Sequence, residues 1–441
     1  MANDKDEFRD IFITAPTGAG KSLLFQLPAL YIAEKYELVT IVISPLIALM
    51  NDQVAQLEKE RSVQTATCIN SSISFEERQC RIEEIRSGKK SIVYLAPELL
   101  LATGLQTLLG DRKIGLLVID EAHTVTAWGR DFRSDYWFLG DFLKSIKKNG
   151  ENFPVLCLTA TAVYTGNDDV VNDTIAELDL NNPILHLGNV KRKNISFDIQ
   201  CKEKEDNGEK LETIKKKLLL EKLRMYVRMG ERTLAYCPYK IHVDSIYSEL
   251  SKEETRIIRR YYGQLKKQEK NITEDEYRAG KILALVCTKA FGMGVDRSDI
   301  KHIIHFAPTG NLSDYVQEIG RAARNPQIEG VAHMDFFLGD MRYVRALHGL
   351  SEIRQYQLKA MLKKIVDIYD SKKHRNLLIA PDSFAHLFQE KELDAKVKNG
   401  LLMLAKDFKG KYGFPVLIVR PRVMLTRIFV SVPDLLEQEF V

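Results

Sequence analysis

The segment "APTGAGKS", residues 15–22, has the residue types and spacing of a phosphate-binding loop. It lies between an apolar run and a segment of helical pattern, which gives the order of strand, turn and helix that such a loop requires. Gly18 and Gly20 permit backbone conformations that turn N–H groups toward phosphate oxygens, and the start of the helix adds partial positive charge. Lys21 is expected to reach the β- and γ-phosphates, and the Ser22 hydroxyl to bind Mg²⁺. The predicted nucleotide-binding residues of this loop are Thr17, Gly18, Ala19, Gly20, Lys21 and Ser22.

Two adjacent carboxylates follow another apolar run in "LLVIDEAH", residues 116–123. At the end of a buried strand, Asp120 can hold Mg²⁺ directly or through water, while Glu121 orients and deprotonates the attacking water. The alternative is a strand followed by a solvated acidic turn. The phosphate loop earlier in the chain favours the catalytic interpretation, so the two segments together predict a site that hydrolyses a nucleoside triphosphate.

The composition is that of a soluble globular chain of 441 residues with a net charge of +4. This charge is small for the length and does not by itself indicate a nucleic-acid partner. No apolar run is long enough to cross a bilayer, and the first residues are charged, so we expect a cytoplasmic protein without membrane association. The six cysteines form no C-x-x-C pair, so neither a zinc site nor a disulfide framework is expected.

Two groups of short apolar runs alternate with helical patterns and predict two α/β domains with parallel sheets. The first group is "IFIT", "LVTIVIS", "SIVYLA", "IGLLVID" and "PVLCLTA", and the second is "RTLAYC", "TRIIRRYY", "ILALVCT" and "HIIHFA". We therefore expect one domain over residues 1–200, another over 201–340, and a mainly helical accessory region over 341–441. Strands are expected near its end, in "PVLIVRPRVMLTRIFVSV".

Further motifs resemble those of the RecQ family of superfamily 2 DNA helicases. "DEAH" (120–123) and "LTATA" (158–162) look like the second and third helicase motifs. Five longer segments narrow the resemblance: "VISPLIALMNDQV" (42–54), "YLAPE" (94–98), "AHTVTAWGRDFRSDY" (122–136), "CTKAFGMGVDRSDIKHIIHF" (287–306) and "YVQEIGRAARN" (315–325). They occur in the family's order over residues 10–340. The resemblance implies two RecA-like domains that form a helicase core, with ATP and Mg²⁺ as cofactors and DNA as partner.

The resemblance also assigns roles to residues of the second domain. Gln317, Arg321 and Arg324 fall in the motif whose arginines act as fingers. Arg321 and Arg324 are expected one turn apart on a helix, facing the γ-phosphate across a cleft; the alternative is a solvated helix that carries two arginines. Gly294 and Asp296 in "GMGVD" are similar to residues that close the second domain on the nucleotide.

Nucleic acid is expected on the face formed by the carboxyl ends of the strands. Hydroxyls, amides and helix N-termini at the family's motif positions would contact a single strand through its backbone, without reading its sequence. Together with the third motif, the residues that match these positions are Ser44, Pro45, Ala96, Pro97, Glu98, Thr159, Thr161 and Thr288.

The segment "HTVTAWGRDFRSDYW" places aromatic residues four apart among arginines. Aromatic rings can stack on bases while arginines contact phosphates, and the alternative is an ordinary core helix with this spacing. In the RecQ family an aromatic-rich loop at this place couples DNA binding to hydrolysis. The resemblance passes this role to His123, Trp128, Phe132 and Arg133.

Three features depart from the family pattern. The family's adenine-reading glutamine, roughly two dozen residues before the loop lysine, has no counterpart because too little chain precedes Lys21. Either the sequence is trimmed or the base is held otherwise, and discrimination between bases by this chain is expected to be weak. No cysteine follows Cys287, so the family's zinc domain is expected to be missing, and Ala323 replaces the glycine usual between the two arginines, which a helix would tolerate.

The resemblance implies ATP-dependent unwinding of DNA, with movement from 3′ to 5′. Two alternatives stay open. One is a translocase that moves along nucleic acid without separating strands, and the other is an ATP-gated module that holds DNA within a larger assembly.

Overall fold

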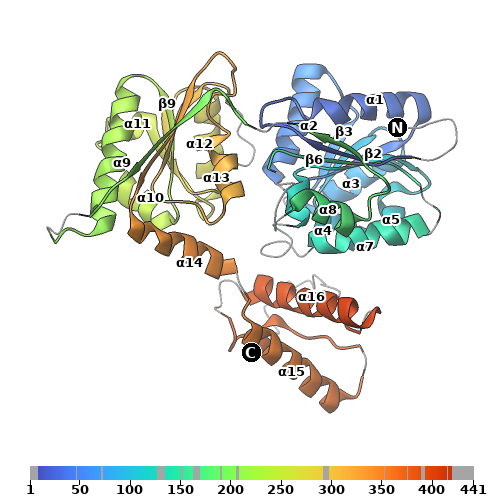
Figure 1. Cartoon of the computed structure of the whole chain (residues 1–441). Helices are drawn as coiled ribbons and strands as arrows, with labels where there is room; N and C mark the ends of the chain where they lie inside the picture. Colours follow the sequence, from blue (N-terminus) through green and yellow to red (C-terminus); the bar gives the residue numbers. More distant parts are fainter. Residues whose placement is uncertain are drawn as a thin grey trace, which may run out of the picture. The chain divides into compact units, whose positions relative to one another are not determined.

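The computed structural model describes residues 8–419, except for 46, 71–72, 127–134, 149, 151, 162–168, 189–190, 205–207, 292–296, 352, 375, 389–392 and 415. The chain divides into two compact units, residues 1–352 and 353–441. The first unit contains two parallel sheets (Figure 1), and each sheet with its covering helices is called a lobe below. In the described part of the chain, no helix is long and apolar enough to cross a membrane.

The first lobe is built on a seven-stranded sheet in the order β3-β4-β2-β5-β6-β1-β7, in which all paired strands run parallel. The strands are β1 (Ile11–Thr14), β2 (Val39–Ile43), β3 (Ala66–Ile69), β4 (Ile92–Leu95), β5 (Ile114–Ile119), β6 (Val155–Thr159) and β7 (Ile184–Leu187). The five predicted runs of this lobe are all strands, and β3 and β7 are additions.

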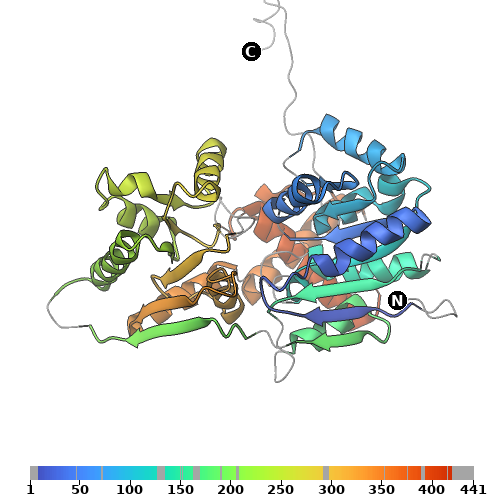
Figure 2. The ribbon, with the colours of Figure 1, turned by 90° about the horizontal axis from the view of Figure 1, so that it is seen from above.

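Helices cover both faces of this sheet (Figures 1 and 2). Along β2, Ile41 and Ile43 belong to one apolar cluster and Val42 to the other, and all three are buried. Both faces therefore lie in the interior, which explains why these parallel strands are continuous apolar runs. One face is covered by α1 (Leu23–Tyr36) and α2 (Ile47–Arg61). The other is covered by α3 (Phe75–Arg86), α4 (Pro97–Thr103), α5 (Leu105–Leu109), α7 (Asp135–Lys148) and α8 (Val170–Leu178).

The second lobe has a six-stranded parallel sheet in the order β10-β11-β9-β12-β13-β8. Its strands are β8 (Ile195–Cys201), β9 (Arg232–Tyr236), β10 (Ile258–Tyr261), β11 (Ala284–Cys287), β12 (Ile300–His305) and β13 (Gly330–Phe336). Because β8 pairs with β13, this lobe begins before the boundary expected at residue 200. The predicted fold class, two RecA-like parallel-sheet domains, is confirmed.

Helices also cover both faces of the second sheet. One face carries α12 (Lys267–Arg278) and α13 (Leu312–Ile319). The other carries α9 (Leu211–Arg228), α10 (Lys240–Tyr247), the short α11 (Glu254–Ile257) and α14 (Met341–Ser351), which follows the 3₁₀ turn η2 (Leu338–Asp340).

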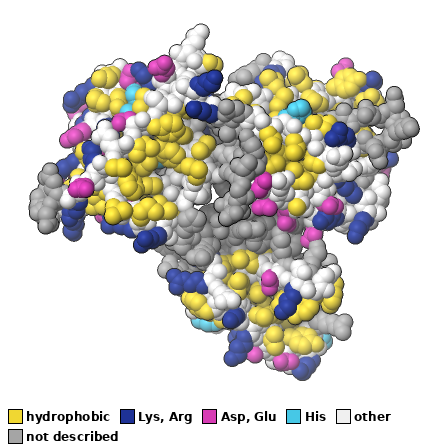
Figure 3. Space-filling model, viewed as in Figure 1, with side chains coloured by type: hydrophobic (Ala, Val, Ile, Leu, Met, Phe, Trp, Pro, Cys, Tyr) yellow, Lys and Arg dark blue, Asp and Glu magenta, His cyan; other side chains and the backbone are white. Residues whose placement is uncertain are grey.

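The C-terminal unit contains α15 (Gln355–Lys372), the 3₁₀ turn η3 (Pro381–Phe384) and α16 (Leu393–Tyr412). Its small core gathers around Met361 and Phe384, both fully buried. Figure 3 shows Lys and Arg side chains around this unit with apolar side chains between them. The strands predicted in residues 415–432 lie largely outside the described residues, and residues 416–419 form no regular structure.

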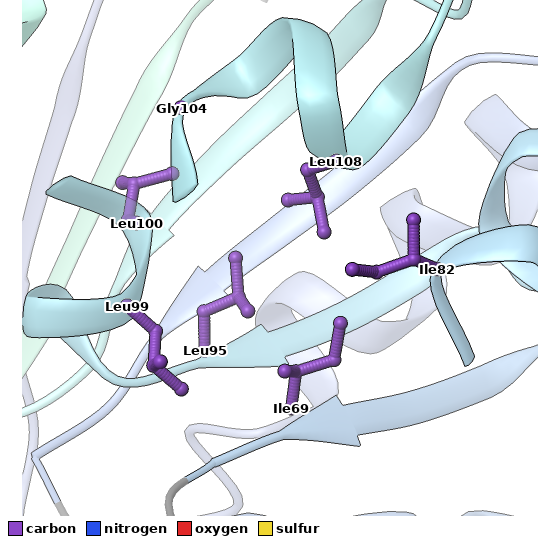
Figure 4. A pocket seen from close by; sticks show the side chains of 7 residues that line it. All are labelled: Ile69, Ile82, Leu95, Leu99, Leu100, Gly104 and Leu108. Atoms are coloured by element: carbon purple, nitrogen blue, oxygen red, sulfur yellow. The ribbon is translucent and has the colours of Figure 1, made fainter. Parts of the chain in front are cut away.

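A small pocket of the first lobe is lined only by apolar side chains and one glycine. Figure 4 shows these side chains turned toward a common space between β3, β4 and the helices α3, α4 and α5. The lining residues are Ile69, Ile82, Leu95, Leu99, Leu100, Gly104 and Leu108. A site without a polar side chain has nothing to orient a phosphate or a base, so we interpret this pocket as imperfect packing of the core.

A buried ion pair fixes the end of the second sheet. Lys215 on α9 lies 2.6 Å from Asp340 Oδ2, and the two side chains are 2% and 0% exposed. Lys215 Nζ also donates to the Asp335 carbonyl at 2.8 Å, while Asp340 Oδ2 accepts the Phe337 N–H at 3.0 Å. The pair therefore ties α9 to the point where β13 ends and η2 begins.

Removing one member of this pair should be costly because the other charge stays buried. We expect Asp340→Ala to lower the free energy of unfolding of the second lobe by about 3–5 kcal/mol. The control is Glu249→Gln, which breaks the exposed pair of the adjacent Lys216 on the same helix, 2.7 Å apart, and should leave the unfolding midpoint unchanged. Denaturant unfolding of both variants measures the difference, and equal midpoints would contradict the interpretation.

Candidate nucleotide and nucleic-acid site

The predicted phosphate loop joins β1 to α1, in the expected order of strand, turn and helix. Gly18 and Gly20 have φ values of +83° and +75°, the left-handed region that a Cβ disfavours. The Ala15 N–H donates to the Thr159 carbonyl at 3.0 Å, which ties the start of the loop to the end of β6. The glycines therefore shape the loop where the carboxyl ends of two strands meet.

Lys21 lies folded into this loop. Its Nζ donates to the carbonyl oxygens of Ala15 and Pro16, each at 3.1 Å. Burial lowers the pKa of Lys21, while the carboxylates of Glu121 and Asp120 act in the opposite direction. A phosphate group that entered the loop would offer the ammonium stronger, charged acceptors in place of the two carbonyls.

Ser22 stands at the N-terminal cap of α1, yet its hydroxyl makes no capping hydrogen bond. The hydroxyl is thus not used by the helix. The Ala19 N–H, by contrast, donates to the Pro16 carbonyl at 3.2 Å within the loop.

The adjacent carboxylates lie at the end of β5, as predicted. Burial raises the pKa of Asp120 to about 7; Glu121 adds to this rise, and Lys21 opposes it. Burial also raises the pKa of Glu121, against the charges of Lys21, Arg321 and Arg324. Cations from both lobes therefore act on the same carboxylate.

The backbone of Glu121 is unusual. Its φ and ψ are +50° and +47°, a conformation that costs an L-residue roughly 1–2 kcal/mol. The Glu121 N–H donates to Asp120 Oδ1 at 2.9 Å, and the Thr124 N–H donates to the Glu121 carbonyl at 2.8 Å. This turn directs the chain from β5 into η1 (Ala122–Val125).

His123 in η1 connects the two lobes. Its Nδ1 lies 2.8 Å from Thr159 Oγ1 and 3.3 Å from Glu121 Oε2, and its Nε2 lies 3.0 Å from Gln317 Nε2 on α13. Burial lowers the pKa of His123 to about 4, so the ring is neutral near pH 7. A proton on Nδ1 satisfies both sides, because a carboxylate only accepts and the Gln317 amide then donates to Nε2.

The arginines of the second lobe do not lie on a helix. α13 ends at Ile319, so the prediction that Arg321 and Arg324 stand one turn apart on a helix is wrong. They belong to residues 320–324, called the arginine turn below. The Ala323 N–H donates to the Ile300 carbonyl of β12 at 2.7 Å, a bond to the sheet that interrupts the helical pattern.

Ala323 also corrects an expectation about the missing glycine. Its φ is +49°, in the left-handed region. The substitution of glycine by alanine is therefore not a helix-propensity effect. It places an L-residue where the backbone favours glycine, at about 1–2 kcal/mol.

The arginine turn lies against the phosphate loop. A Cβ on Gly18 would meet Arg324 Cγ at 3.8 Å, and a Cβ on Gly320 would come within 2.6 Å of Thr17 Oγ1. Thr17 Oγ1 donates to the Gly320 carbonyl at 3.3 Å. Arg321 Nε is buried and has no hydrogen-bond partner among the described residues, so this donor is free for a ligand.

The predicted nucleic-acid contacts lie at or directly after the carboxyl ends of β2, β4, β6 and β11. Their residues are Ser44, Pro45, Ala96, Pro97, Glu98, Thr159, Thr161 and Thr288. Ser44 N–H donates to the Leu95 carbonyl at 3.0 Å, which places two of these motifs side by side. Trp128, Phe132, Arg133, Gly294 and Asp296 lie outside the described residues.

Sequence reasoning missed Arg192, which precedes β8 and contacts both Thr17 and the arginine turn. Its position in the basic run "KRK", residues 191–193, resembles an ordinary solvated linker. No spacing pattern in the sequence distinguishes Arg192 from its lysine neighbours.

Two protein-family models match the chain. They are the DEAD/DEAH box helicase model over residues 3–169 and the helicase conserved C-terminal domain model over residues 209–326. Among curated proteins, the chain is 34% identical over 317 residues to the probable ATP-dependent DNA helicase RecS of Bacillus subtilis (strain 168), and 31% identical over 319 residues to the ATP-dependent DNA helicase RecQ of Pasteurella multocida (strain Pm70). Each alignment covers 72% of this chain. The chain belongs to the RecQ-like superfamily 2 helicases.

A third relative extends the RecQ-like match beyond the two lobes. The chain is 31% identical over 384 residues, 85% of its length, to the bifunctional 3'-5' exonuclease/ATP-dependent helicase WRN of Mus musculus. The chain spans 59% of the length of the Bacillus relative, 46% of the Pasteurella relative and 25% of the mouse relative.

Solved helicase structures share the RecQ-like core's fold. The DUF1998 helicase MrfA, bound to DNA, superimposes with a TM-score of 0.63 at 21% identity, covering 76% of this chain and 48% of that one. The DEAD-box helicase Mss116, bound to single-stranded RNA and UDP-BeF, gives a TM-score of 0.63 at 15% identity, covering 93% and 87%. At these identities the likeness concerns the fold.

The bond between His123 and Gln317 predicts a coupled pair. Since it joins the DEAH segment of one lobe to α13 of the other, we expect His123→Ala and Gln317→Ala each to lower DNA-stimulated ATP turnover about tenfold. The double variant should lose little more, because either change breaks the same contact. The steady-state ATP turnover of the parent, the two single variants and the double variant is measured at saturating DNA. Gln327→Ala, at an exposed position, is the control. Independent, multiplying losses would show that the contact carries no coupling.

Proposed function

We propose that this chain hydrolyses ATP with Mg²⁺ and uses the reaction to move 3′ to 5′ along single-stranded DNA and separate duplex strands. One observation carries the proposal: the arginine turn lies against the phosphate loop, where Thr17 Oγ1 donates to the Gly320 carbonyl at 3.3 Å. Lys21 and the two arginines of the second lobe therefore all act on the partly buried Glu121 at the end of β5. Such a set of charges fits a triphosphate held between lobes. The RecQ-like relatives, which are named as DNA helicases, support DNA as the substrate.

The residues at the loop fit a magnesium ion. Burial raises the pKa of the Asp120 carboxylate to about 7. A cation beside this carboxylate would stabilise its charged form. Ser22 offers a hydroxyl that the helix does not use. Both are oxygen ligands of the kind Mg²⁺ prefers, and the ion would supply charge neutralisation at the β- and γ-phosphates.

The remaining residues would bind the phosphates, activate the water and stabilise the transition state. Lys21 would exchange its loop carbonyls for phosphate oxygens. Glu121 would orient the attacking water and accept its proton, a role that its raised pKa suits. Arg321 and Arg324 would neutralise charge that develops on the γ-phosphate, and the free Arg321 Nε is a donor for that purpose.

DNA would lie along the carboxyl ends of the strands. Ser44 and Thr161 have buried hydroxyl oxygens without a hydrogen-bond partner among the described residues, and such groups suit contacts to a phosphate backbone. His123 would link that face to Gln317 and hence to the arginine turn. Trp128, Phe132 and Arg133 complete the proposed coupling segment, which starts directly after the DEAH carboxylates.

The phosphate loop and the carboxylates give the first test. We expect Lys21→Ala to abolish ATP hydrolysis, because phosphate neutralisation is lost, and Glu121→Gln to retain nucleotide binding while turnover stops. Lys35→Ala, an exposed lysine at the other end of α1, is the matched control. Hydrolysis and strand displacement are measured together on 3′-tailed and 5′-tailed duplexes. Normal hydrolysis by either site variant refutes the active site, whereas hydrolysis without displacement by the parent chain identifies a translocase.

The arginine turn gives the second test. Arg324→Ala should lower kcat by roughly 10³-fold or more while the nucleotide affinity changes only a few-fold, since a finger acts mainly in the transition state. Steady-state kinetics and equilibrium binding of a labelled nucleotide separate the two quantities. An unchanged kcat with a raised KM would make Arg324 a ground-state binder instead.

A further inference from the structure

Arg192 lies where the chain passes from the first lobe to the second, between β7 and β8. A guanidinium group has five N–H donors in a rigid plane. The structure gives Arg192 five hydrogen bonds, one to a side chain and four to main-chain carbonyls. Nε donates to Asn194 Oδ1 at 3.2 Å. The carbonyl acceptors belong to Thr17, Gly320, Ala322 and Ala323.

Three of these carbonyls belong to the arginine turn. The residues of this turn follow α13, which ends at Ile319, so their carbonyls need hydrogen-bond donors from outside the helix. Arg192 supplies partners to Gly320 at 3.3 Å, to Ala322 at 3.0 Å and to Ala323. Asn194 supports the same turn, since its Nδ2 donates to the Ala323 carbonyl at 2.8 Å. The left-handed backbone of Ala323 is thus held from outside by two side chains.

The fourth carbonyl connects the turn to the phosphate loop. Arg192 Nη1 donates both to Thr17 at 3.1 Å and to Gly320 at 3.3 Å, so one nitrogen bridges the two lobes. Thr17 Oγ1 donates to the same Gly320 carbonyl at 3.3 Å. A shift of the phosphate loop on binding a nucleotide would therefore act on the arginine turn through these bonds.

The chemistry of these contacts requires arginine. The partners of Arg192 are neutral oxygens of five different residues, and a lysine ammonium is a point charge that cannot reach all of them at once. Burial and the neighbouring charge of Arg324 lower the pKa of Arg192. The Arg192 guanidinium therefore lies near the like charge of Arg324, and the carbonyl dipoles that accept its hydrogen bonds offset this repulsion.

We propose that Arg192 is a positioning residue that holds the arginine turn on the phosphate loop, and thereby aims Arg321 and Arg324 at the γ-phosphate. Arg192 itself touches neither the nucleotide nor DNA in this assignment. It sets the geometry in which the fingers act. The inference rests on the proposed finger role of the arginine turn.

The test compares Arg192→Ala, Arg192→Lys and the control Lys193→Ala, which removes the same charge from an exposed neighbour. We expect Arg192→Ala to lower kcat for ATP hydrolysis at least tenfold, with the KM for ATP within about threefold, because the lost geometry matters in the transition state. Arg192→Lys should also be impaired, though it keeps the charge. Lys193→Ala should hydrolyse ATP like the parent.

A mutant cycle with both arginines of the turn replaced separates positioning from general loss of structure. If Arg192 acts through Arg321 and Arg324, Arg192→Ala should lower kcat less than about twofold when both are already alanine. Multiplying effects, or a normal kcat for Arg192→Ala and Arg192→Lys, would overturn the proposal. If thermal unfolding shows that Arg192→Ala is not folded, Arg192→Lys replaces it in the cycle. A normal kcat for Arg324→Ala alone would refute the finger role itself. A lowered kcat for Arg324→Ala, together with normal kcat values for the Arg192 variants, would refute only the positioning role of Arg192.

Discussion

Two adjacent carboxylates, Asp120 and Glu121, lie partly buried at the end of β5, and the cations around them offset the cost of removing these carboxylates from water. An uncompensated carboxylate in the interior costs several kcal/mol, so the fold must bring positive charge to it or keep it protonated. Both responses occur here: the pKa of Asp120 rises to about 7, and Lys21, Arg321 and Arg324 all act on Glu121. Because the arginines come from the other lobe, the charge balance of the site depends on the two lobes together.

Neutral hydrogen bonds complete the link between the lobes. His123, with a pKa lowered to about 4, joins Thr159 and Gln317 without carrying charge. Thr17 and Gly320 meet through a hydroxyl and a carbonyl at 3.3 Å. Such bonds have strict geometry but little net energy, about 0.5–1.5 kcal/mol each. They can therefore specify how the lobes meet while allowing them to separate during a cycle of hydrolysis.

Backbone strain occurs at this site as well as at several other described turns. Glu121 and Ala323 both have positive φ although neither is glycine. Each lies in a turn that follows a regular element and points a charged group of the turn toward the phosphate loop. A conformation that costs about 1–2 kcal/mol persists only where its surroundings fix it. Around Ala323 those surroundings are the Ile300 carbonyl, Asn194 and Arg192.

The sequence by itself determined the fold class and the first-lobe half of the site. Parallel strands buried on both faces are continuous apolar runs, so runs such as "LVTIVIS" and "IGLLVID" identify them, and the phosphate loop and carboxylates follow directly from local spacing. The strands that were missed are of two kinds. β7 is half-exposed at one edge of its sheet, and β8 is mostly exposed at an edge of the other sheet, so neither strand needs an apolar run. β3 is only four residues long, and neither β3 nor β13 has a distinctive sequence pattern.

The tertiary structure alone decided the shape of the arginine turn and the part played by Arg192. The residues "QEIGRAAR" form a plausible helix on local propensity, yet the Ala323 N–H bonds to β12 and the helix stops at Ile319. That bond joins segments distant in the chain, and no local pattern encodes it. Arg192 is likewise defined by carbonyls of residues 17 and 320–323, since main-chain acceptors exist at every position and leave no signature in the sequence. Local chemistry can be inferred from residue types, but the partners of a backbone carbonyl exist only once the chain has folded.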